Sequence, residues 1–159
     1  MTAYTFVTVW RIEAPIDAVW EAIYNSDRWP TWWGSVRRVD EISHGDDSGT
    51  GNVRRYVWRS RLPYALNFEL RVTRVQRPVA LEGVSSGELA GRGTWNLSSD
   101  GTVTTIRNTW EVQTSQAWMN LLAPIARPLF AWNHACSMRQ GGEALARLLG
   151  ARLVEITHA

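Results

Sequence analysis

The chain has 159 residues, of which 45% are hydrophobic and 20% charged, and its formal net charge is +2. This length predicts one domain over residues 1–159, and no apolar run reaches the roughly 18 residues that a membrane-spanning helix needs. All 17 basic residues are arginine, which excludes lysine Schiff-base chemistry, and the small net charge gives no reason to expect nucleic-acid binding.

The N-terminal residues and the cysteine count indicate where the protein works. The stretch MTAYTFVTVWRIEAP lacks a basic region followed by an apolar run, so we expect neither a signal peptide nor stable membrane insertion. The lone cysteine, Cys136, excludes an intramolecular disulfide and fits a small helix residue better than a reactive thiol. Together these features predict a cytoplasmic location.

A strand followed by two helices opens the predicted fold. Residues 4–13 alternate between apolar and polar side chains, which predicts a half-buried strand. From Pro15 onward the spacing becomes helical, so a first helix buries one face, and a second, short helix follows in the tryptophan-rich segment up to Trp33. The apolar positions of the first helix are Ile16, Val19, Trp20 and Ile23.

Six more strands with short turns follow the helix pair. Alternating patterns separated by Gly, Pro, Asn and Asp are typical of an antiparallel meander. The predicted strands are residues 36–43, 52–61, 64–76, 79–87, 91–99 and 102–114.

Helical periodicity returns in the C-terminal part of the chain. Two prolines interrupt its beginning, because proline removes an intrahelical hydrogen bond and clashes with the preceding turn: Pro124 and Pro128. We therefore expect a short helix over residues 117–123. A long helix should then begin at Ile125 or Pro128 and end at Leu149.

One antiparallel sheet and one long helix bury their apolar faces most readily against each other. The expected fold class is therefore α+β, with a curved antiparallel sheet of about seven strands wrapped around the C-terminal helix. Gly141 and Gly142 indicate that the helix backbone comes very close to the tryptophan-rich helices or to a ligand. Alternation points large side chains inward, where they either fill the core or line a pocket: Trp10, Tyr56, Trp58, Leu66, Phe68, Leu70, Trp95, Trp110 and Val112.

Three motifs near the N-terminus resemble the START-like (SRPBCC) superfamily, which includes polyketide cyclases and dehydrases, birch-pollen-type allergens and lipid-transfer domains. They read Ile12-Glu13-Ala14-Pro15, Val19-Trp20-Glu21-Ala22-Ile23 and Asp27-Arg28-Trp29-Pro30-Thr31-Trp32. Residues 116–142 resemble a subgroup labelled polyketide cyclase/dehydrase. The resemblance covers the full length and implies one helix-grip domain with a cavity between sheet and helix. It does not separate binding from catalysis, because the superfamily holds binding proteins and enzymes alike.

The resemblance implies that the cavity holds a hydrophobic ligand, which would be polyketide-, quinone- or lipid-like. The expected ligand-binding residues are Trp33, Tyr56, Trp58, Phe68, Leu70, Trp95, Trp110 and Phe130. Trp29, Trp32 and Trp33 are expected to form part of the lid where the ligand enters, with Trp33 touching it.

Polar residues that can face the cavity are the candidates for catalysis. Asn108 shares a strand face with Trp110, and Asn133 and His134 lie on the long helix among apolar residues. His134 suits proton transfer near neutral pH, but it is equally explained as a core histidine held by a backbone carbonyl or as an exposed one.

Arginine is the other candidate for a polar group in the cavity. The resemblance to aromatase/cyclases implies a cavity arginine that polarises a poly-β-ketone, and here Arg59, Arg92 or Arg107 would serve. Alternation, however, turns Arg59 and Arg107 away from the aromatic face. The adjacent pair Arg54 and Arg55 is expected on a solvated strand face.

Two hypotheses for the function remain. The sequence contains no HExxH, CxxC or Gly-x-Ser-x-Gly pattern, so we expect no metal, no cofactor and no nucleophilic catalysis. The first hypothesis is a protein that binds a hydrophobic small molecule. The second is a polyketide cyclase-, aromatase- or dehydrase-type enzyme acting in the same cavity. The sequence favours binding, because it shows cavity walls but no convergent acid–base set; a ligand-free interaction domain would require the aromatic side chains to fill the cavity.

Overall fold

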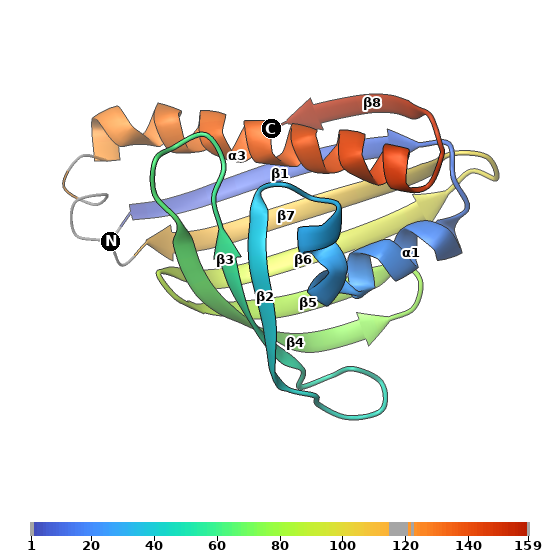
Figure 1. Ribbon diagram of the computed structural model, residues 1–159, viewed down its shortest axis with the longest axis horizontal. Helices are drawn as coiled ribbons and strands as arrows, with labels where there is room; N and C mark the ends of the chain where they lie inside the picture. Colours follow the sequence, from blue (N-terminus) through green and yellow to red (C-terminus); the bar gives the residue numbers. More distant parts are fainter. Residues whose placement is uncertain (1, 115–120, 122, 159) are drawn as a thin grey trace.

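Eight antiparallel strands form one sheet in the order β2-β3-β4-β5-β6-β7-β1-β8, and a long helix lies against it (Figure 1). The computed structural model describes residues 2–114, 121 and 123–158. Its elements are β1 (Thr2–Ile12), α1 (Ile16–Tyr24), the 3₁₀-helix η1 (Ser26–Thr31), β2 (Val36–Ser43), β3 (Val53–Trp58), β4 (Leu66–Gln76), β5 (Ala80–Gly87), β6 (Leu89–Ser99), β7 (Thr104–Thr114), α3 (Ala123–Leu148) and β8 (Leu153–His158). The predicted helix-grip fold is confirmed, with one strand more than expected.

Strands β2 to β7 pair with their neighbours in sequence, and β1 then pairs with the last of them. The register of β1 with β7 runs without a break from Thr2↔Thr114 to Ile12↔Thr104. At its other edge β1 pairs with β8, from Thr8↔His158 to Ile12↔Leu153. The first strand in the sequence is therefore an interior strand of the sheet.

Strand β8 is missing from the sequence prediction, which ends the fold at the C-terminal helix. That helix ends in a Schellman motif, because Gly150 has a φ of +62°. The N–H of Gly150 donates to the Arg147 carbonyl at 3.2 Å, and the N–H of Ala151 donates to the Ala146 carbonyl at 2.8 Å. This turn returns the chain along β1. A strand of 6 residues at a sheet edge carries little periodic signal, so the turn is the better indicator of it.

Helix α3 is continuous from Ala123 to Leu148, although its two prolines predict an interruption. Pro124 lies in the first turn, where backbone N–H groups have no intrahelical acceptor in any case. Pro128 removes only the hydrogen bond to the carbonyl of Pro124, so the helix continues through it. The short helix predicted over residues 117–123 falls almost entirely outside the described residues.

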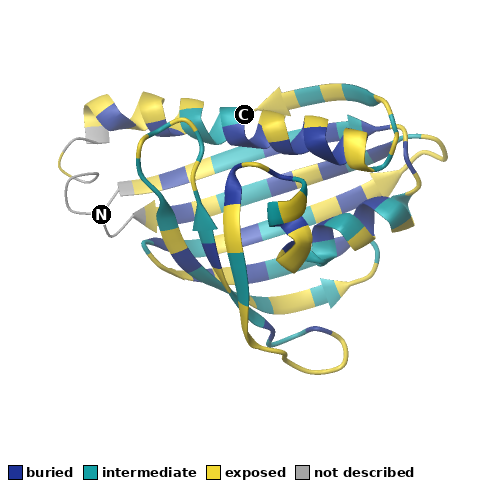
Figure 2. Cartoon of the chain, viewed as in Figure 1, coloured by how far each residue is buried: buried dark blue, intermediate teal, exposed yellow. Residues whose placement is uncertain are grey.

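Glycines bring α3 close to the tryptophans of the core. Buried and exposed residues alternate along the strands, and α3 buries the face that it turns toward the sheet (Figure 2). A Cβ on Gly141 would lie 2.4 Å from the ring of Trp33, and one on Gly142 would lie 2.9 Å from Nε1 of Trp10. The prediction that this glycine pair marks a close approach to the tryptophan-rich segment is confirmed.

Two indole N–H groups tie α3 to the rest of the fold at Ser137. Nε1 of Trp33 donates to the Ser137 carbonyl at 3.0 Å. Nε1 of Trp58, at the end of β3, donates to the Ser137 hydroxyl at 2.8 Å. The sheet therefore curves far enough to bring β3 onto α3, and the helix is gripped from two sides.

Replacing Gly141 by alanine should destabilise the protein, although alanine normally stabilises a helix by about 1 kcal/mol relative to glycine. The new methyl group would overlap the indole of Trp33, which its hydrogen bond to Ser137 holds in place. We expect a net loss of about 1–3 kcal/mol in the free energy of unfolding, measured by urea denaturation. Glu143→Ala, an exposed position on the same helix, should change this free energy by less than about 0.5 kcal/mol. An unchanged or increased stability of Gly141→Ala would contradict the packing described.

Candidate functional site

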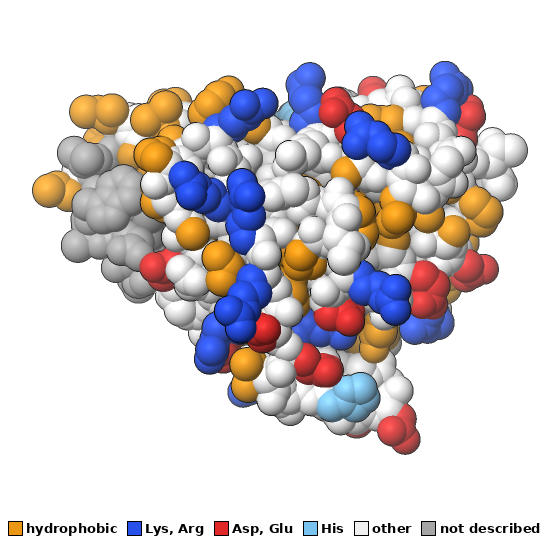
Figure 3. Space-filling view, in the orientation of Figure 1, with side chains coloured by type: hydrophobic (Ala, Val, Ile, Leu, Met, Phe, Trp, Pro, Cys, Tyr) orange, Lys and Arg blue, Asp and Glu red, His pale blue; other side chains and the backbone are white. Residues whose placement is uncertain are grey.

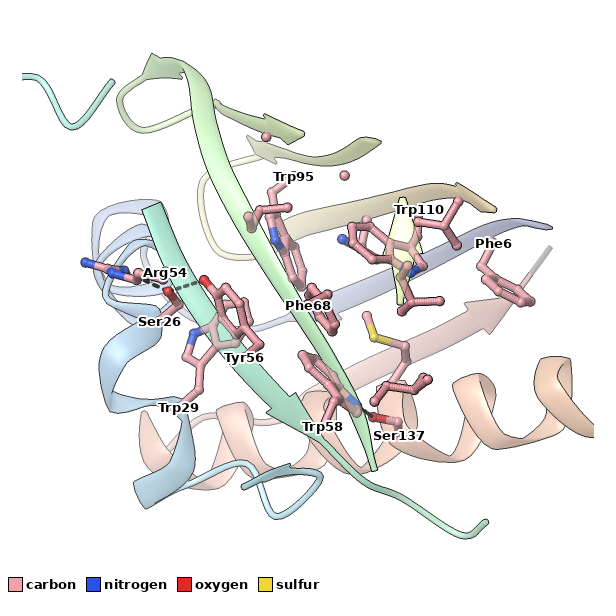
Figure 4. A pocket seen from close by; sticks show the side chains of 18 of the residues that line it. Phe6, Ser26, Trp29, Arg54, Tyr56, Trp58, Phe68, Trp95, Trp110 and Ser137 are labelled. Atoms are coloured by element: carbon pink, nitrogen blue, oxygen red, sulfur yellow. Dashed lines mark hydrogen bonds between the residues drawn. The ribbon is translucent and has the colours of Figure 1, made fainter. Parts of the chain in front are cut away.

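A cavity of about 160 Å³ lies between the sheet, η1 and α3 (Figure 4). All eight side chains predicted to hold a ligand line it: Trp33, Tyr56, Trp58, Phe68, Leu70, Trp95, Trp110 and Phe130. Five more tyrosine, phenylalanine and tryptophan rings contribute to the lining, from Tyr4, Phe6, Tyr24, Trp29 and Tyr64. The aromatic side chains thus surround an open space instead of filling it, and contact of any of them with a ligand stays a prediction.

Ring-to-ring contacts hold the walls of the cavity. Trp33 meets Trp58 edge-on with ring centroids 4.9 Å apart, and it lies 5.2 Å from Trp29. Tyr56 stacks on Phe68 at 5.4 Å. Such aromatic pairs are worth about 0.5–1.5 kcal/mol each beyond the area that they bury. Packing therefore fixes the shape of the cavity before any ligand is present.

Trp33 is a wall of the cavity and not a lid, which corrects the sequence prediction. Its side chain is fully buried, and its N–H is bound to the Ser137 carbonyl. Trp32 does not line the cavity, whereas Trp29 does and donates its N–H to the Ala22 carbonyl at 3.0 Å. The prediction is wrong because the chain leaving η1 turns Trp33 inward, onto the glycine pair of α3.

One end of the cavity carries a polar cluster of Arg54, Ser26 and Tyr56 (Figure 4). Nη1 of Arg54 donates to Ser26 Oγ at 2.7 Å and to the Tyr24 carbonyl at 3.2 Å. The hydroxyls of Ser26 and Tyr56 share a hydrogen bond of 2.6 Å, and burial raises the pKa of Tyr56, so its hydroxyl stays protonated. The Arg54 side chain is only 15% exposed, and its Nε–H is buried without an acceptor among the described residues. The cluster therefore contains one charged donor that is buried and has no acceptor among the described residues.

Arg54 is the polar residue that the sequence prediction misses. The prediction of a solvated strand face is confirmed for Arg55, which is exposed and pairs with Glu69 at 2.8 Å. It is wrong for Arg54, which lines the cavity. Side chains alternate along β3, so Arg54 shares the face of Tyr56 and Trp58, and this alternation is the signal that identifies it. The three arginines proposed from the sequence do not line the cavity: Arg59, Arg92 and Arg107.

His134 and Asn133 line the cavity from α3. The ring of His134 stacks on Phe6 with centroids 4.3 Å apart. Burial, with a smaller contribution from a neighbouring histidine, lowers the pKa of His134 to about 4, so the ring is neutral at physiological pH. Oδ1 of Asn133 accepts the backbone N–H groups of Arg61 at 2.8 Å and Leu62 at 3.1 Å. Asn133 therefore holds the β3–β4 turn against α3, which accounts for it without a catalytic role.

Asn108, the third polar candidate, lines the cavity from β7 and donates from Nδ2 to the Thr94 carbonyl at 3.4 Å. A catalytic role for Asn108, Asn133 or His134 stays a prediction. Within residues 2–114 and 123–158, no three His, Cys, Asp or Glu side chains lie close enough together to hold a metal ion. No helix in the described part of the chain is long and apolar enough to cross a membrane.

Solved structures with this arrangement include an aromatase/cyclase, a START superfamily protein and a plant latex-like protein. The Zhui aromatase/cyclase from Streptomyces sp. R1128 has a TM-score of 0.77 over 94% of both chains, at 14% identity. The START superfamily protein from Mycobacterium smegmatis has a TM-score of 0.74 at 10% identity, over 92% of this chain and 98% of that one. Major latex-like protein 151 from Panax ginseng has a TM-score of 0.59 at 9% identity, over 82% of this chain and 97% of that one. At these identities the likeness is one of fold alone.

The sequence itself is matched by a family model over residues 4–150. That family is described as polyketide cyclase / dehydrase and lipid transport. No curated protein matches the sequence significantly. Because the family model spans nearly the whole chain, the protein belongs to the polyketide cyclase/dehydrase and lipid transport family.

Proposed function

We propose that the protein binds a compact, planar and mostly apolar small molecule in the aromatic cavity. The observation that carries this proposal is a space of about 160 Å³ walled by aromatic rings. Apolar cavities of about 150 Å³ take up benzene, whereas pockets that bury drug-sized ligands measure roughly 300–1,000 Å³. The space therefore suits one or two fused rings better than a fatty chain or an extended polyketide. Of the hydrophobic ligands expected from the sequence, a quinone-like one fits best.

The surroundings of Arg54 indicate that this ligand carries an oxygen atom. A buried donor without an acceptor costs about 1–3 kcal/mol, and more when the group is charged. A ligand carbonyl at this end of the cavity would accept the Nε–H hydrogen bond and remove that cost. Nη2 of Arg54 lies 3.8 Å from Oδ1 of Asp27, which partly balances the guanidinium charge, so a neutral oxygen suffices. The proposed ligand is thus a planar apolar body with one carbonyl oxygen directed at Arg54.

A second candidate function, a cyclase-, aromatase- or dehydrase-type activity in the same cavity, is favoured by the same cluster. A carbonyl held by Arg54 would be polarised, and the hydroxyls of Ser26 and Tyr56 lie beside the guanidinium. Such a reaction also requires a proton acceptor, and neither His134 nor Asn133 is a strong one. His134, with a pKa of about 4, is a weak base at neutral pH, and the amide oxygen of Asn133 is occupied by the β3–β4 turn. Binding is therefore the better supported function.

A matched pair of bicyclic probes tests the proposed ligand. α-Tetralone and tetralin share one ring framework, but only α-tetralone carries a carbonyl. We expect α-tetralone to bind about tenfold more tightly than tetralin, measured by quenching of tryptophan fluorescence and by calorimetry, because only its oxygen satisfies Arg54. Arg54→Met should remove this preference, while Arg55→Met, on the opposite face of the same strand, should preserve it.

Three results would reject or redirect this proposal. No binding of either probe by the folded protein would refute the cavity as a ligand site. A tenfold preference that survives Arg54→Met would refute the anchoring role of Arg54 alone. Conversion of the β-hydroxy derivative of α-tetralone to α-naphthol, with loss of water and dependence on Arg54, would establish the enzymatic alternative instead.

The half-buried, neutral His134 should make stability depend on pH. Its pKa of about 4 in the folded state lies below the ordinary value of 6.5, so the unfolded chain takes up the proton first as pH falls. The free energy of unfolding should therefore fall between pH 6.5 and about 4, by an amount on the order of 3 kcal/mol for this residue, and stay flat above that window. His134→Phe, which preserves stacking on Phe6, should flatten this part of the curve in urea denaturation. An NMR titration that finds His134 protonating near 6.5 would contradict the lowered pKa.

A further inference from the structure

The N-terminal half of α3 exposes large apolar side chains to solvent. Ile125, Leu129 and Trp132 are 72%, 49% and 51% exposed, and Leu121, just before the helix, is 82% exposed. These are four of the seven large hydrophobic side chains that are exposed in the described part of the chain. At 3.6 residues per turn Ile125, Leu129 and Trp132 fall within an arc of about 60°, so they share one face of the helix. We call these four residues the α3 stripe.

The α3 stripe is not required by the fold. The opposite face of the same turns is the one that packs inward, through Ala126 and Phe130, which are buried. A helix that covers a sheet normally carries polar residues on its outer face. Hydrophobic atoms instead run along this part of α3 on the surface, with arginine groups beside them (Figure 3). Contiguous exposed apolar surface of this kind marks an interaction site.

The charged side chains on the β3–β4 turn, beside the α3 stripe, are positive. Arg59 and Arg61 lie on the β3–β4 turn, which Asn133 fastens to the side of α3 through the N–H groups of Arg61 and Leu62. Arg139 is exposed farther along α3, one helical turn before the exposed Glu143. These three arginines form no ion pair with a described residue.

Acidic residues are missing from both segments that build this surface. The sequence has no Asp or Glu between Glu111 and Glu143, nor between Asp47 and Glu69. The surface therefore combines apolar side chains with the unpaired positive charges of Arg59 and Arg61, and its partner should be apolar and negatively charged.

We propose that the α3 stripe docks on an anionic lipid surface. Leucine, isoleucine and tryptophan on one helix face, flanked by arginine, enter the boundary between head groups and acyl chains, while the arginines contact anionic head groups. A second copy of the chain is a poorer partner, because a twofold contact through this face would bring the same arginines together. The helix lies on the membrane and does not cross it.

Docking in this way would place the cavity beside the lipid. Phe130 and His134 line the cavity from the same turns of α3 whose outer face is the α3 stripe. Only this part of α3 and the β3–β4 turn would then separate the cavity from an apolar molecule dissolved in the bilayer. The docking itself does not depend on which ligand the cavity takes.

Flotation with lipid vesicles tests the proposal on the full chain. The protein should float with vesicles of phosphatidylcholine and phosphatidylglycerol in equal parts, and at least about tenfold less with phosphatidylcholine alone. Ile125→Ser together with Trp132→Ser should lower the partition coefficient about tenfold or more. Arg59→Ser and Arg61→Ser should each lower it about fivefold on the anionic vesicles. Ile42→Ser is the matched control, since Ile42 is as exposed as Trp132, at 51%, but lies on β2.

All variants change exposed residues, so their melting temperatures should stay close to that of the parent chain. A second measurement needs no substitution at the α3 stripe. Lipids brominated near the head group should quench part of the tryptophan fluorescence of the parent protein, because docking brings Trp132 close to them. Failure to float with anionic vesicles, or equal loss of binding in the Ile42→Ser control, would overturn the proposal. So would a stable dimer in light scattering that the stripe substitutions disperse, because the face would then be covered by a second copy.

Discussion

The close approach of α3 to Trp33 is the contact on which the rest of the structure depends. Gly141 has no side chain, so the indole of Trp33 lies directly on the helix backbone. The N–H of that indole is bound to the carbonyl of Ser137, whose hydroxyl accepts a second indole N–H from β3. These contacts set the distance between the helix and the curved sheet. They therefore also set the volume of the cavity, because Trp33 is part of the core and part of the cavity wall.

The polar end of the cavity departs from what a purely structural interior would contain. Burying a guanidinium group is unfavourable unless its donors are satisfied, and the Ser26 hydroxyl and the Tyr24 carbonyl satisfy only part of Arg54. An apolar side chain at this position on β3 would extend the aromatic wall and leave no unpaired donor. Local departures of this kind concentrate at functional sites, where the missing partner arrives with the ligand. The Nε–H of Arg54, buried without an acceptor, therefore adds support for a ligand to that given by the aromatic lining.

The sequence predicts the architecture well because its signals are local and strong. Alternation along the strands and helical spacing after Pro15 depend only on neighbouring residues, and six of the eight predicted wall residues, all on strands, follow from the same alternation. The errors arise where tertiary contacts decide. Trp33 is turned inward by the glycines of a helix more than 100 positions later in the chain. Arg54 is predicted on a solvated face because charged residues are normally exposed, although its place between Asn52 and Tyr56 on alternating positions indicates the inner face. Strand β8 forms because the turn after α3 returns the chain to β1 as a pairing partner. The short, mixed sequence of the strand indicates neither the turn nor the partner.

The central claim is that the cavity is already built for a small planar ligand whose oxygen is received by Arg54. A crystal structure of the protein soaked with α-tetralone tests it most directly. We expect the bicyclic ring inside the aromatic cavity beside Tyr56 and Phe68, with its carbonyl oxygen about 2.7–3.2 Å from Nε of Arg54, which becomes exposed to the cavity in the complex. Density for the ligand with its carbonyl pointing away from Arg54, or an interior in which the aromatic rings close the cavity and exclude the ligand, would contradict it.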